Sequence, residues 1–205
     1  MKGLFVTVEG IDGAGKTTQL GWLKDFFQRQ GRSVVTTREP GGTSLGEALR
    51  ALLLNPQQAM DPETETLLIF AARREHLARI ILPALGEGKV VLCDRFTDAT
   101  YAYQGNGRGV GHDRIRALEQ WVQSDLQPDL TILFDVPVEL GQQRARNTRE
   151  ADRFERERVE FFERVRQGYL QRARENASRF LVVDASVGTL DIHKVLEERL
   201  VTHDF

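Results

Sequence analysis

The sequence predicts a three-layer α/β fold built on a five-stranded parallel sheet, and three observations support this prediction. Five short apolar runs are continuous rather than alternating, which is typical of strands buried on both faces of a parallel sheet. Segments with helical spacing of apolar residues separate the runs, as in βαβ units. The chain has 205 residues, of which 40% are hydrophobic, and this is ordinary for a single domain with a substantial core.

The expected strands and the first helices follow in chain order. The strands are expected at Leu4–Val8, Ser33–Thr36, Lys89–Cys93, Leu130–Phe134 and Phe180–Val183. An apolar stripe from Leu20 to Phe27 predicts a helix that begins after residue 16 and ends near Gly31. A second stripe, from Leu45 to Leu53, predicts another helix.

The later helices have clearer start and stop signals. Asp61 followed by Pro62 predicts a helix start, because a capping side chain precedes a proline in the first turn. Pro83 is expected to disturb or end that helix. A long charged helix is expected over about 153–176, and a last one over about 190–200.

The composition excludes several classes of protein. The formal net charge of −2 provides no overall positive field for nucleic acid or a membrane surface. Cys93 is the only cysteine, which excludes an internal disulfide and a cysteine-based zinc site. No run of about 18 apolar residues occurs, and the first residues lead into a strand pattern rather than a signal peptide. We therefore expect a cytoplasmic protein that binds neither nucleic acid nor membrane.

The strongest motif is a glycine-rich loop between the first expected strand and the first expected helix. It fits the P-loop pattern G-x-x-x-x-G-K-[ST] and comprises Gly10, Ile11, Asp12, Gly13, Ala14, Gly15, Lys16, Thr17 and Thr18. Such a loop points consecutive backbone N–H groups at an anion beside a helix N-terminus. Lys16 would contact the β- and γ-phosphates of a nucleoside triphosphate, and the Thr17 hydroxyl would bind Mg²⁺. The motif therefore predicts a nucleoside triphosphate site.

The P-loop does not name a reaction, because motors, switches and small-molecule kinases share it. The sequence contains no Asn-Lys pair, which argues against the guanine-reading motif of a GTPase. Asp94 and Asp135 each follow an apolar strand, at the sheet edge where open α/β sheets bind their ligands. One of them could hold Mg²⁺, and at least one is expected to be structural.

Several residues suggest a second phosphate-bearing substrate. Arg95 follows Asp94 directly, which places a carboxylate for a metal and a guanidinium for an anion at one strand end. Arg38 follows the second strand and reaches the same edge of the sheet. Phe70 and Arg74 are four residues apart on one helix, so a ring that stacks on a base could lie beside a guanidinium. Phe70 by itself also suits a core position.

Eight segments occur in a characteristic order and cover nearly the whole chain. They are VEGIDGAGKTTQ (8–19), REPGGT (38–43), FAARR (70–74), DRF (94–96), AYQG (102–105), FDVP (134–137), DRFE (152–155) and FFERVRQGYL (161–170). Together they resemble the thymidylate kinase family of the bacterial type. The resemblance implies a P-loop nucleotide kinase fold that transfers the γ-phosphoryl group of ATP to dTMP with Mg²⁺. The product, dTDP, would supply dTTP for DNA replication.

The resemblance also implies a role for individual residues. The implied dTMP site consists of Asp12, Arg38, Phe70, Arg74, Arg95, Thr100, Tyr103 and Gln104. Catalytic roles would fall to Asp12, Lys16, Arg95 and Arg153. Thr17 and Asp94 would hold Mg²⁺, the latter through water. Family members are homodimers, so a homodimer is expected. Arg73 departs from the family pattern, in which an acidic or small residue is usual.

A small mobile lid is expected over about 141–153. The P-loop carries Gly13 instead of an arginine, and relatives of this kind supply arginines from the lid. Arg144, Arg149 and Arg153 are the candidates, and Arg153 is the preferred transition-state cation, acting like an arginine finger supplied by the same chain.

Two alternatives stay open. A kinase for another pyrimidine monophosphate would differ only in its base pocket. A P-loop ATPase switch would turn over nucleotide without any acceptor.

Overall fold

The computed structural model describes residues 2–146 and 152–202 and confirms the predicted sheet. Five strands lie in the order β2-β3-β1-β4-β5, and every neighbouring pair is parallel. The strands are β1 (Leu4–Glu9), β2 (Val34–Arg38), β3 (Val90–Asp94), β4 (Leu130–Asp135) and β5 (Phe180–Asp184). Each strand runs one or two residues past its apolar run and ends on a charged side chain. The carboxyl edge of the sheet is therefore lined with charge.

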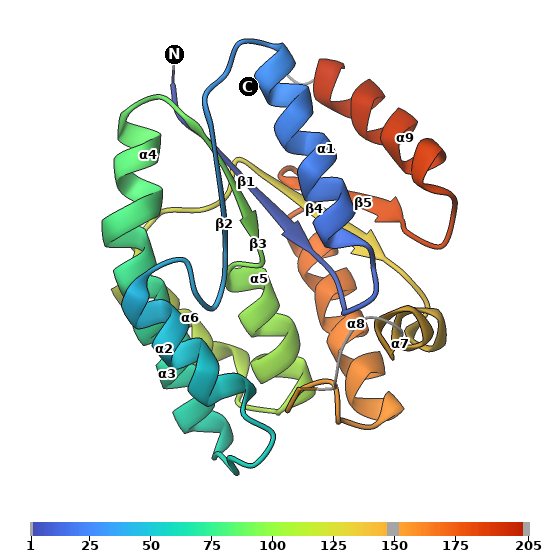
Figure 1. Ribbon diagram of the computed structural model, residues 1–205. Helices are drawn as coiled ribbons and strands as arrows, with labels where there is room; N and C mark the ends of the chain where they lie inside the picture. Colours follow the sequence, from blue (N-terminus) through green and yellow to red (C-terminus); the bar gives the residue numbers. More distant parts are fainter. Residues whose placement is uncertain (1, 147–151, 203–205) are drawn as a thin grey trace.

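Alternate residues of β1 face the two sides of the sheet. Leu4, Val6 and Val8 pack in the cluster that contains the apolar side chains of α1 (Lys16–Arg29) and α9 (Thr189–Thr202). These two helices lie side by side on one face (Figure 1), where the rings of Trp22 and His193 stack with centroids 4.8 Å apart. The 3.6-residue spacing of α1 thus serves to bury it against the sheet.

The other face of the sheet packs against the long helical stretch that begins at Asp61. Phe5 of β1 belongs to a cluster with Leu77 and Ile81. The stretch comprises α3 (Pro62–His76), π-helical turns at Leu77–Ile81 and α4 (Leu82–Gly86). The expected disturbance at Pro83 is confirmed as this local widening, because proline lacks an N–H and its ring crowds the preceding turn.

The chain after β3 forms a helix that the sequence did not indicate. It consists of α5 (Thr97–Thr100) followed by π-helical turns at Tyr101–Gly107. It packs closely on α8 (Val159–Glu175). A Cβ on Gly168 would come within 2.9 Å of the Asn106 side chain, so the close approach of the two helices depends on that glycine.

Helix α8 begins six residues later than expected. The carboxylate of Asp152 accepts hydrogen bonds from the backbone N–H groups of Phe154 and Glu155 at 2.9 and 3.0 Å. Such side-chain bonds to the following backbone favour a turn over helix. The segment 152–158 is therefore a turn.

Three further helices complete the described chain. They are α2 (Ser44–Leu54), α6 (His112–Gln123) and α7 (Val138–Arg146). The apolar stripe of α2 is only partly buried, since Leu53 is inaccessible whereas Leu45 and Leu52 are exposed. Within residues 2–146 and 152–202, no helix is both long and apolar enough to cross a membrane.

Candidate active site

The P-loop lies between β1 and α1, as its sequence predicts. Gly10, Gly13 and Gly15 have φ angles of 135°, 78° and 83°, which glycine adopts without a steric cost. A Cβ on Gly13 would lie 1.9 Å from the carbonyl oxygen of Gly141 in α7. The absence of a side chain at position 13 therefore lets the start of the expected lid pack directly on the loop.

Lys16 folds back over the P-loop. Its Nζ donates hydrogen bonds to the carbonyl oxygens of Gly10 and Ile11, at 3.1 and 3.0 Å. Burial lowers the pKa of Lys16, and the nearby Arg95 lowers it further. The ammonium lies in a cleft that is also lined by Thr17 and Thr18. In this cleft the ammonium can exchange carbonyl oxygens for phosphate oxygens.

The two aspartates at strand ends differ in their partners. Asp135 receives two hydrogen bonds from the Arg166 guanidinium, at 2.7 and 2.8 Å, and is structural. Asp94 lines the P-loop cleft, and its Oδ1 is buried without a hydrogen-bond partner among the described residues. A buried carboxylate oxygen without a donor is costly unless a cation or a donor group reaches it. Asp94, with Thr17 in the same cleft, thus fits Mg²⁺, which prefers one or two carboxylates plus phosphate and water oxygens.

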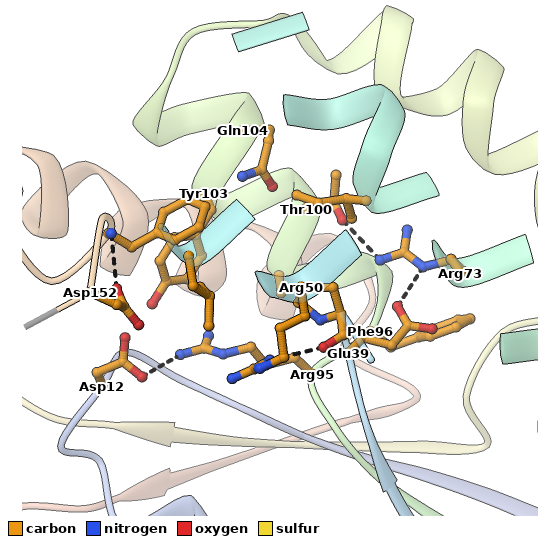
Figure 2. A pocket seen from close by; sticks show the side chains of 15 residues that line it. Asp12, Glu39, Arg50, Arg73, Arg95, Phe96, Thr100, Tyr103, Gln104 and Asp152 are labelled. Atoms are coloured by element: carbon orange, nitrogen blue, oxygen red, sulfur yellow. Dashed lines mark hydrogen bonds and ion pairs between the residues drawn. The ribbon is translucent and has the colours of Figure 1, made fainter. Parts of the chain in front are cut away.

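A second, smaller pocket adjoins the P-loop cleft (Figure 2). Its empty space is about 600 Å³, including the open mouth. Four side chains line both cavities and mark their junction: Asp12, Glu39, Arg50 and Arg95. Two anionic groups bound in these cavities would meet at a junction that carries two guanidinium groups. Such a geometry suits transfer of a group between two phosphates.

Arg95 is held at this junction in an unusual backbone conformation. Its φ of 69° is in the left-handed region, which arginine rarely adopts. Its Nη2 donates to Asp12 Oδ1 and its Nη1 to the Tyr169 hydroxyl, both at 2.9 Å. The guanidinium lies over the Tyr103 ring, 4.8 Å from its centroid. Although burial acts to lower the pKa of Arg95, Tyr103, Tyr169 and Asp12 raise it well above its usual value.

The expected pairing of Phe70 with Arg74 is wrong by one position on α3. Arg74 is exposed, whereas Arg73 is 1% exposed and lines the second pocket together with Ile69. Phe70 is buried in a separate cluster beneath the guanidinium of Arg73, whose Cζ is 4.7 Å from the ring centroid. In each of the two pairs, Phe70 with Arg74 and Ile69 with Arg73, the residues are four positions apart on α3. The rotation of the helix about its axis decides which pair faces the pocket.

Arg73 is fixed by its neighbours. Its Nε donates to Glu39 Oε2 at 2.7 Å, and its Nη2 donates to Thr100 Oγ1 at 3.0 Å. Its Nη1 is buried and has no hydrogen-bond partner among the described residues. Figure 2 shows Thr100, Tyr103 and Gln104 around the same pocket, so these three expected site residues do lie together.

Gln104 makes a contact that sets the orientation of its amide. Its Nε2 donates to the buried carboxylate of Glu65 at 2.7 Å. Because a carboxylate only accepts, the amide nitrogen must face Glu65 and the amide oxygen must face away from it. Gln104 lines the pocket, and its amide oxygen, turned away from Glu65, can accept a hydrogen bond from a group bound there.

The expected lid arginines lie in different places. Arg144 lines the P-loop cleft, and its Nη1 donates to the Ala185 carbonyl oxygen at 2.8 Å. Arg149 lies outside the described residues. Arg153 is not among the residues that line the P-loop cleft: its Nη2 pairs with Glu65 at 2.6 Å, and its Nε donates to the Leu53 carbonyl oxygen at 2.7 Å. The structure therefore brings Arg144, but not Arg153, to the P-loop.

Arg38 lies in the P-loop cleft rather than in the second pocket. It is half exposed and pairs with Glu47 at 3.0 Å. Sequence reasoning assigned no role to Glu39, Arg50, Glu65 or Tyr169. The only available signal was that Glu39 and Tyr169 lie inside two of the characteristic segments, whereas Arg50 and Glu65 read as ordinary charged positions on helices.

Comparisons with known proteins show which family this chain is similar to. A sequence model of the family described as thymidylate kinase matches residues 8–196. A thymidylate kinase of Nitrosomonas europaea is 59% identical, with 100% of this chain and 94% of the relative covered. One from Pseudomonas syringae is 55% identical, covering 98% of this chain and 96% of the relative.

A solved structure is similar over the same length. The crystal structure of thymidylate kinase from Ehrlichia chaffeensis superposes with a TM-score of 0.80 at 38% identity. The match covers 98% of this chain and 99% of that one. Because the family model, the relatives and this structure match over nearly the whole length, the chain belongs to the thymidylate kinase family.

Proposed function

We propose that this protein transfers the γ-phosphoryl group of ATP to the phosphate of dTMP, forming ADP and dTDP. The observation that carries the proposal is the junction of the P-loop cleft with a second pocket at Asp12 and Arg95. ATP occupies the P-loop cleft with its γ-phosphate toward this junction, and dTMP occupies the second pocket with its phosphate beside Arg95. Transfer is direct and in line, without a covalent enzyme intermediate.

The chain contributes positioning and charge to this reaction. Lys16 and the P-loop N–H groups bind the donor phosphates. Arg95 holds the acceptor phosphate, and Asp12 keeps the guanidinium at the junction through their 2.9 Å hydrogen bond. Because both substrates are anionic, neutralising their repulsion and fixing the attack geometry account for most of the rate enhancement.

Mg²⁺ fits beside the donor phosphates. Asp94, whose Oδ1 has no hydrogen-bond partner in the part of the chain that the structure describes, and the Thr17 hydroxyl are the groups that would hold it, Asp94 through water. The ion would neutralise charge on the β- and γ-phosphates. Loss of Mg²⁺ should abolish turnover, and Asp94→Asn should raise the Mg²⁺ concentration required for half-maximal rate.

The lid provides further positive charge. Residues at about 141–153 act as a lid within a single domain that spans residues 1–205. Support comes from Gly141, which packs on Gly13 of the P-loop, and from Arg144 in the cleft. Arg144 and Arg149 are then the candidates for a transition-state cation. Arg153 anchors the downstream end of the lid to Glu65, which also accepts a hydrogen bond from Gln104 of the second pocket.

The second pocket carries a pattern of donors and acceptors that favours thymine. Thymine has an N3–H donor beside the O4 acceptor, whereas cytosine has an N3 acceptor beside a 4-amino donor. The Gln104 oxygen faces away from Glu65 and suits an N3–H. The Nη1 of Arg73, which has no partner within residues 2–146 and 152–202, suits a carbonyl oxygen such as O4. A kinase for dCMP would need the opposite pattern, so dUMP is the nearest competitor.

The protein acts as a homodimer in the cytoplasm, where both nucleotides occur. The dimer is supported by an exposed apolar surface on the adjacent helices α3 and α6. Trp121 is 80% exposed and Leu67 is 54% exposed, and these two helices contact each other. Apolar surface of this kind is typical of protein interfaces.

The test is release of ADP from ATP and Mg²⁺ with dTMP, dUMP, dCMP, dGMP or no acceptor, at equal concentrations. We expect a strong preference for dTMP, followed by dUMP. A preference for dCMP would refute the base assignment and leave the phosphate chemistry standing. Equal release with and without acceptors would refute the kinase and support a hydrolysing switch.

A further inference from the structure

We propose that Glu9 and Tyr169 form a clamp that fixes Arg95 at both its backbone and its side chain, so that Tyr169 is a positioning residue for the acceptor phosphate. The inference rests on the proposed function, because it takes Arg95 as the group that binds that phosphate. Neither Glu9 nor Tyr169 lines the second pocket or the P-loop cleft. Both would therefore act through the residues they contact, among which Arg95 is the one that binds the acceptor phosphate.

Arg95 needs such a clamp for two reasons. Its φ of 69° is unfavourable for a residue with a side chain, so the surrounding structure must hold the backbone. Its side chain is long and has several rotatable bonds, and ordering it before the substrate binds removes an entropic cost from binding. A preorganised guanidinium binds an anion more tightly than one that must first be ordered.

The end of β1 fixes the backbone on both sides of Arg95. The Arg95 N–H donates to the carbonyl oxygen of Val8 at 2.9 Å. The next N–H, that of Phe96, donates to Glu9 Oε1 at 2.7 Å. Consecutive residues of β1 thus bind consecutive N–H groups of the turn. Glu9 is 0% exposed, so water does not compete for this contact.

The same carboxylate orients the residue that holds the side chain. Glu9 Oε2 accepts a hydrogen bond from the Tyr169 hydroxyl at 2.8 Å. Since a hydroxyl has a single proton, donation to the ionised form of Glu9 turns the hydroxyl lone pairs toward Arg95. The Arg95 Nη1 donates to that oxygen at 2.9 Å. One carboxylate at the end of β1 therefore fixes the guanidinium through a side chain of α8.

The test compares two tyrosines in matched settings. Tyr169→Phe removes only the hydroxyl that contacts Arg95. Tyr101→Phe is the control, because Tyr101 is also buried and also donates to a carboxylate, that of Glu119, away from both cavities. Loss of one hydrogen bond to a charged group should raise the KM and the Kd for dTMP about tenfold in Tyr169→Phe. The KM for ATP should stay at the wild-type value, and Tyr101→Phe should change neither KM.

A double variant separates positioning from a general loss of stability. In an Arg95→Ala background, Tyr169→Phe should leave the KM for dTMP unchanged, because the residue through which it acts is absent. At a pH above the Glu9 pKa of about 8, where the carboxyl is ionised, Glu9→Gln preserves side-chain volume and should raise the KM for dTMP in the wild-type background. This variant provides the same test if Tyr169→Phe does not fold. An unchanged dTMP affinity in both Tyr169→Phe and Glu9→Gln would overturn the clamp.

Equal losses in Tyr169→Phe and Tyr101→Phe, or a full further loss in the Arg95→Ala background, would also overturn it. Failure of the proposed function would look different, because the wild-type enzyme itself would then show no dTMP-dependent release of ADP. Wild-type turnover with dTMP together with unaffected Tyr169→Phe and Glu9→Gln variants would refute the clamp and leave the proposed function standing.

Discussion

Replacing Arg73 by lysine tests the assignment of the base pocket most directly. Arg73 uses Nε for Glu39 and Nη2 for Thr100, and its Nη1 is buried and free of partners among the described residues. Lysine keeps the positive charge that compensates Glu39, which is only 4% exposed. A single ammonium cannot bind the carboxylate, the hydroxyl and a base carbonyl in these three directions. The variant should therefore fold but lose a donor to the base.

The expected size of the effect follows from that one contact. A hydrogen bond from a charged donor contributes about 1.5–3 kcal/mol, which corresponds to a fall of about 10- to 100-fold in kcat/KM for dTMP. The measurement is ADP release with dTMP and dCMP as acceptors, with Tm as the control for folding. Arg73→Ala should instead be unstable by about 3–5 kcal/mol, because it removes the guanidinium that pairs with the buried Glu39 carboxylate and leaves that carboxylate with the imidazole of His76 as its partner.

Arg74→Lys is the matched control for this experiment. Arg74 lies next to Arg73 in the sequence, but its side chain is exposed. Substitutions at such positions usually change free energies by less than about 0.5 kcal/mol, so kcat/KM should stay within about twofold of the wild type. A large loss in Arg74→Lys with little effect of Arg73→Lys would refute the reasoning and restore the pairing of Phe70 with Arg74.

The remaining predictions concern the phosphate site, the lid and a buried carboxyl. Arg95→Ala should raise the KM for dTMP at least tenfold, and a larger effect on the KM for ATP would contradict its role. Arg144→Ala should lower kcat with little change in Tm, whereas Arg153→Ala should lower Tm with little change in kcat. Steady-state rates and thermal melts of the two variants test this. Burial, with Asp98 nearby, raises the pKa of Glu9 to about 8 despite the opposing influence of Arg95 and a hydrogen bond from Tyr169. Between pH 5 and 8 the folded state then binds a proton that the unfolded state has lost. As the pH rises through this range, the free energy of unfolding of the wild type should therefore fall by about 1.4 kcal/mol per pH unit more than that of Glu9→Gln. Urea titrations at several pH values measure this, and the same pH dependence in both proteins would exclude it.

The sequence predicted the sheet well because its strands are continuous apolar runs. Val90, Val91, Leu92 and Cys93 are all completely inaccessible, and such a run can only be a strand covered on both faces. The strand ends were predicted less well, since each strand extends to a polar residue such as Glu9. The helix at 97–107 was missed because its glycines and tyrosines carry no helical stripe, and packing on α8 stabilises it instead.

The P-loop was identified from its sequence alone because a chemical constraint fixes it locally. A glycine-rich turn beside a helix N-terminus points consecutive N–H groups at a phosphate, so the motif carries its own geometry. Arg95 was identified for a similar reason, as the residue that follows an aspartate at a strand end. Asp94 and Asp135 had the same sequence signature, and only tertiary contacts distinguished them: Arg166 binds Asp135, whereas Asp94 lines the P-loop cleft.

By itself, the sequence determined the α/β architecture, the anion-binding loop and membership of a nucleotide kinase family, because these depend on local patterns of apolar residues and glycines. Tertiary structure decided which of two adjacent arginines on α3 faces the pocket, where Arg144 and Arg153 lie, and that Glu9 and Tyr169 support Arg95. Each of these depends on the rotation of a helix or on contact between residues far apart in the chain. Glu9 and Tyr169 are separated by 160 positions, and no spacing in a single sequence encodes their contact.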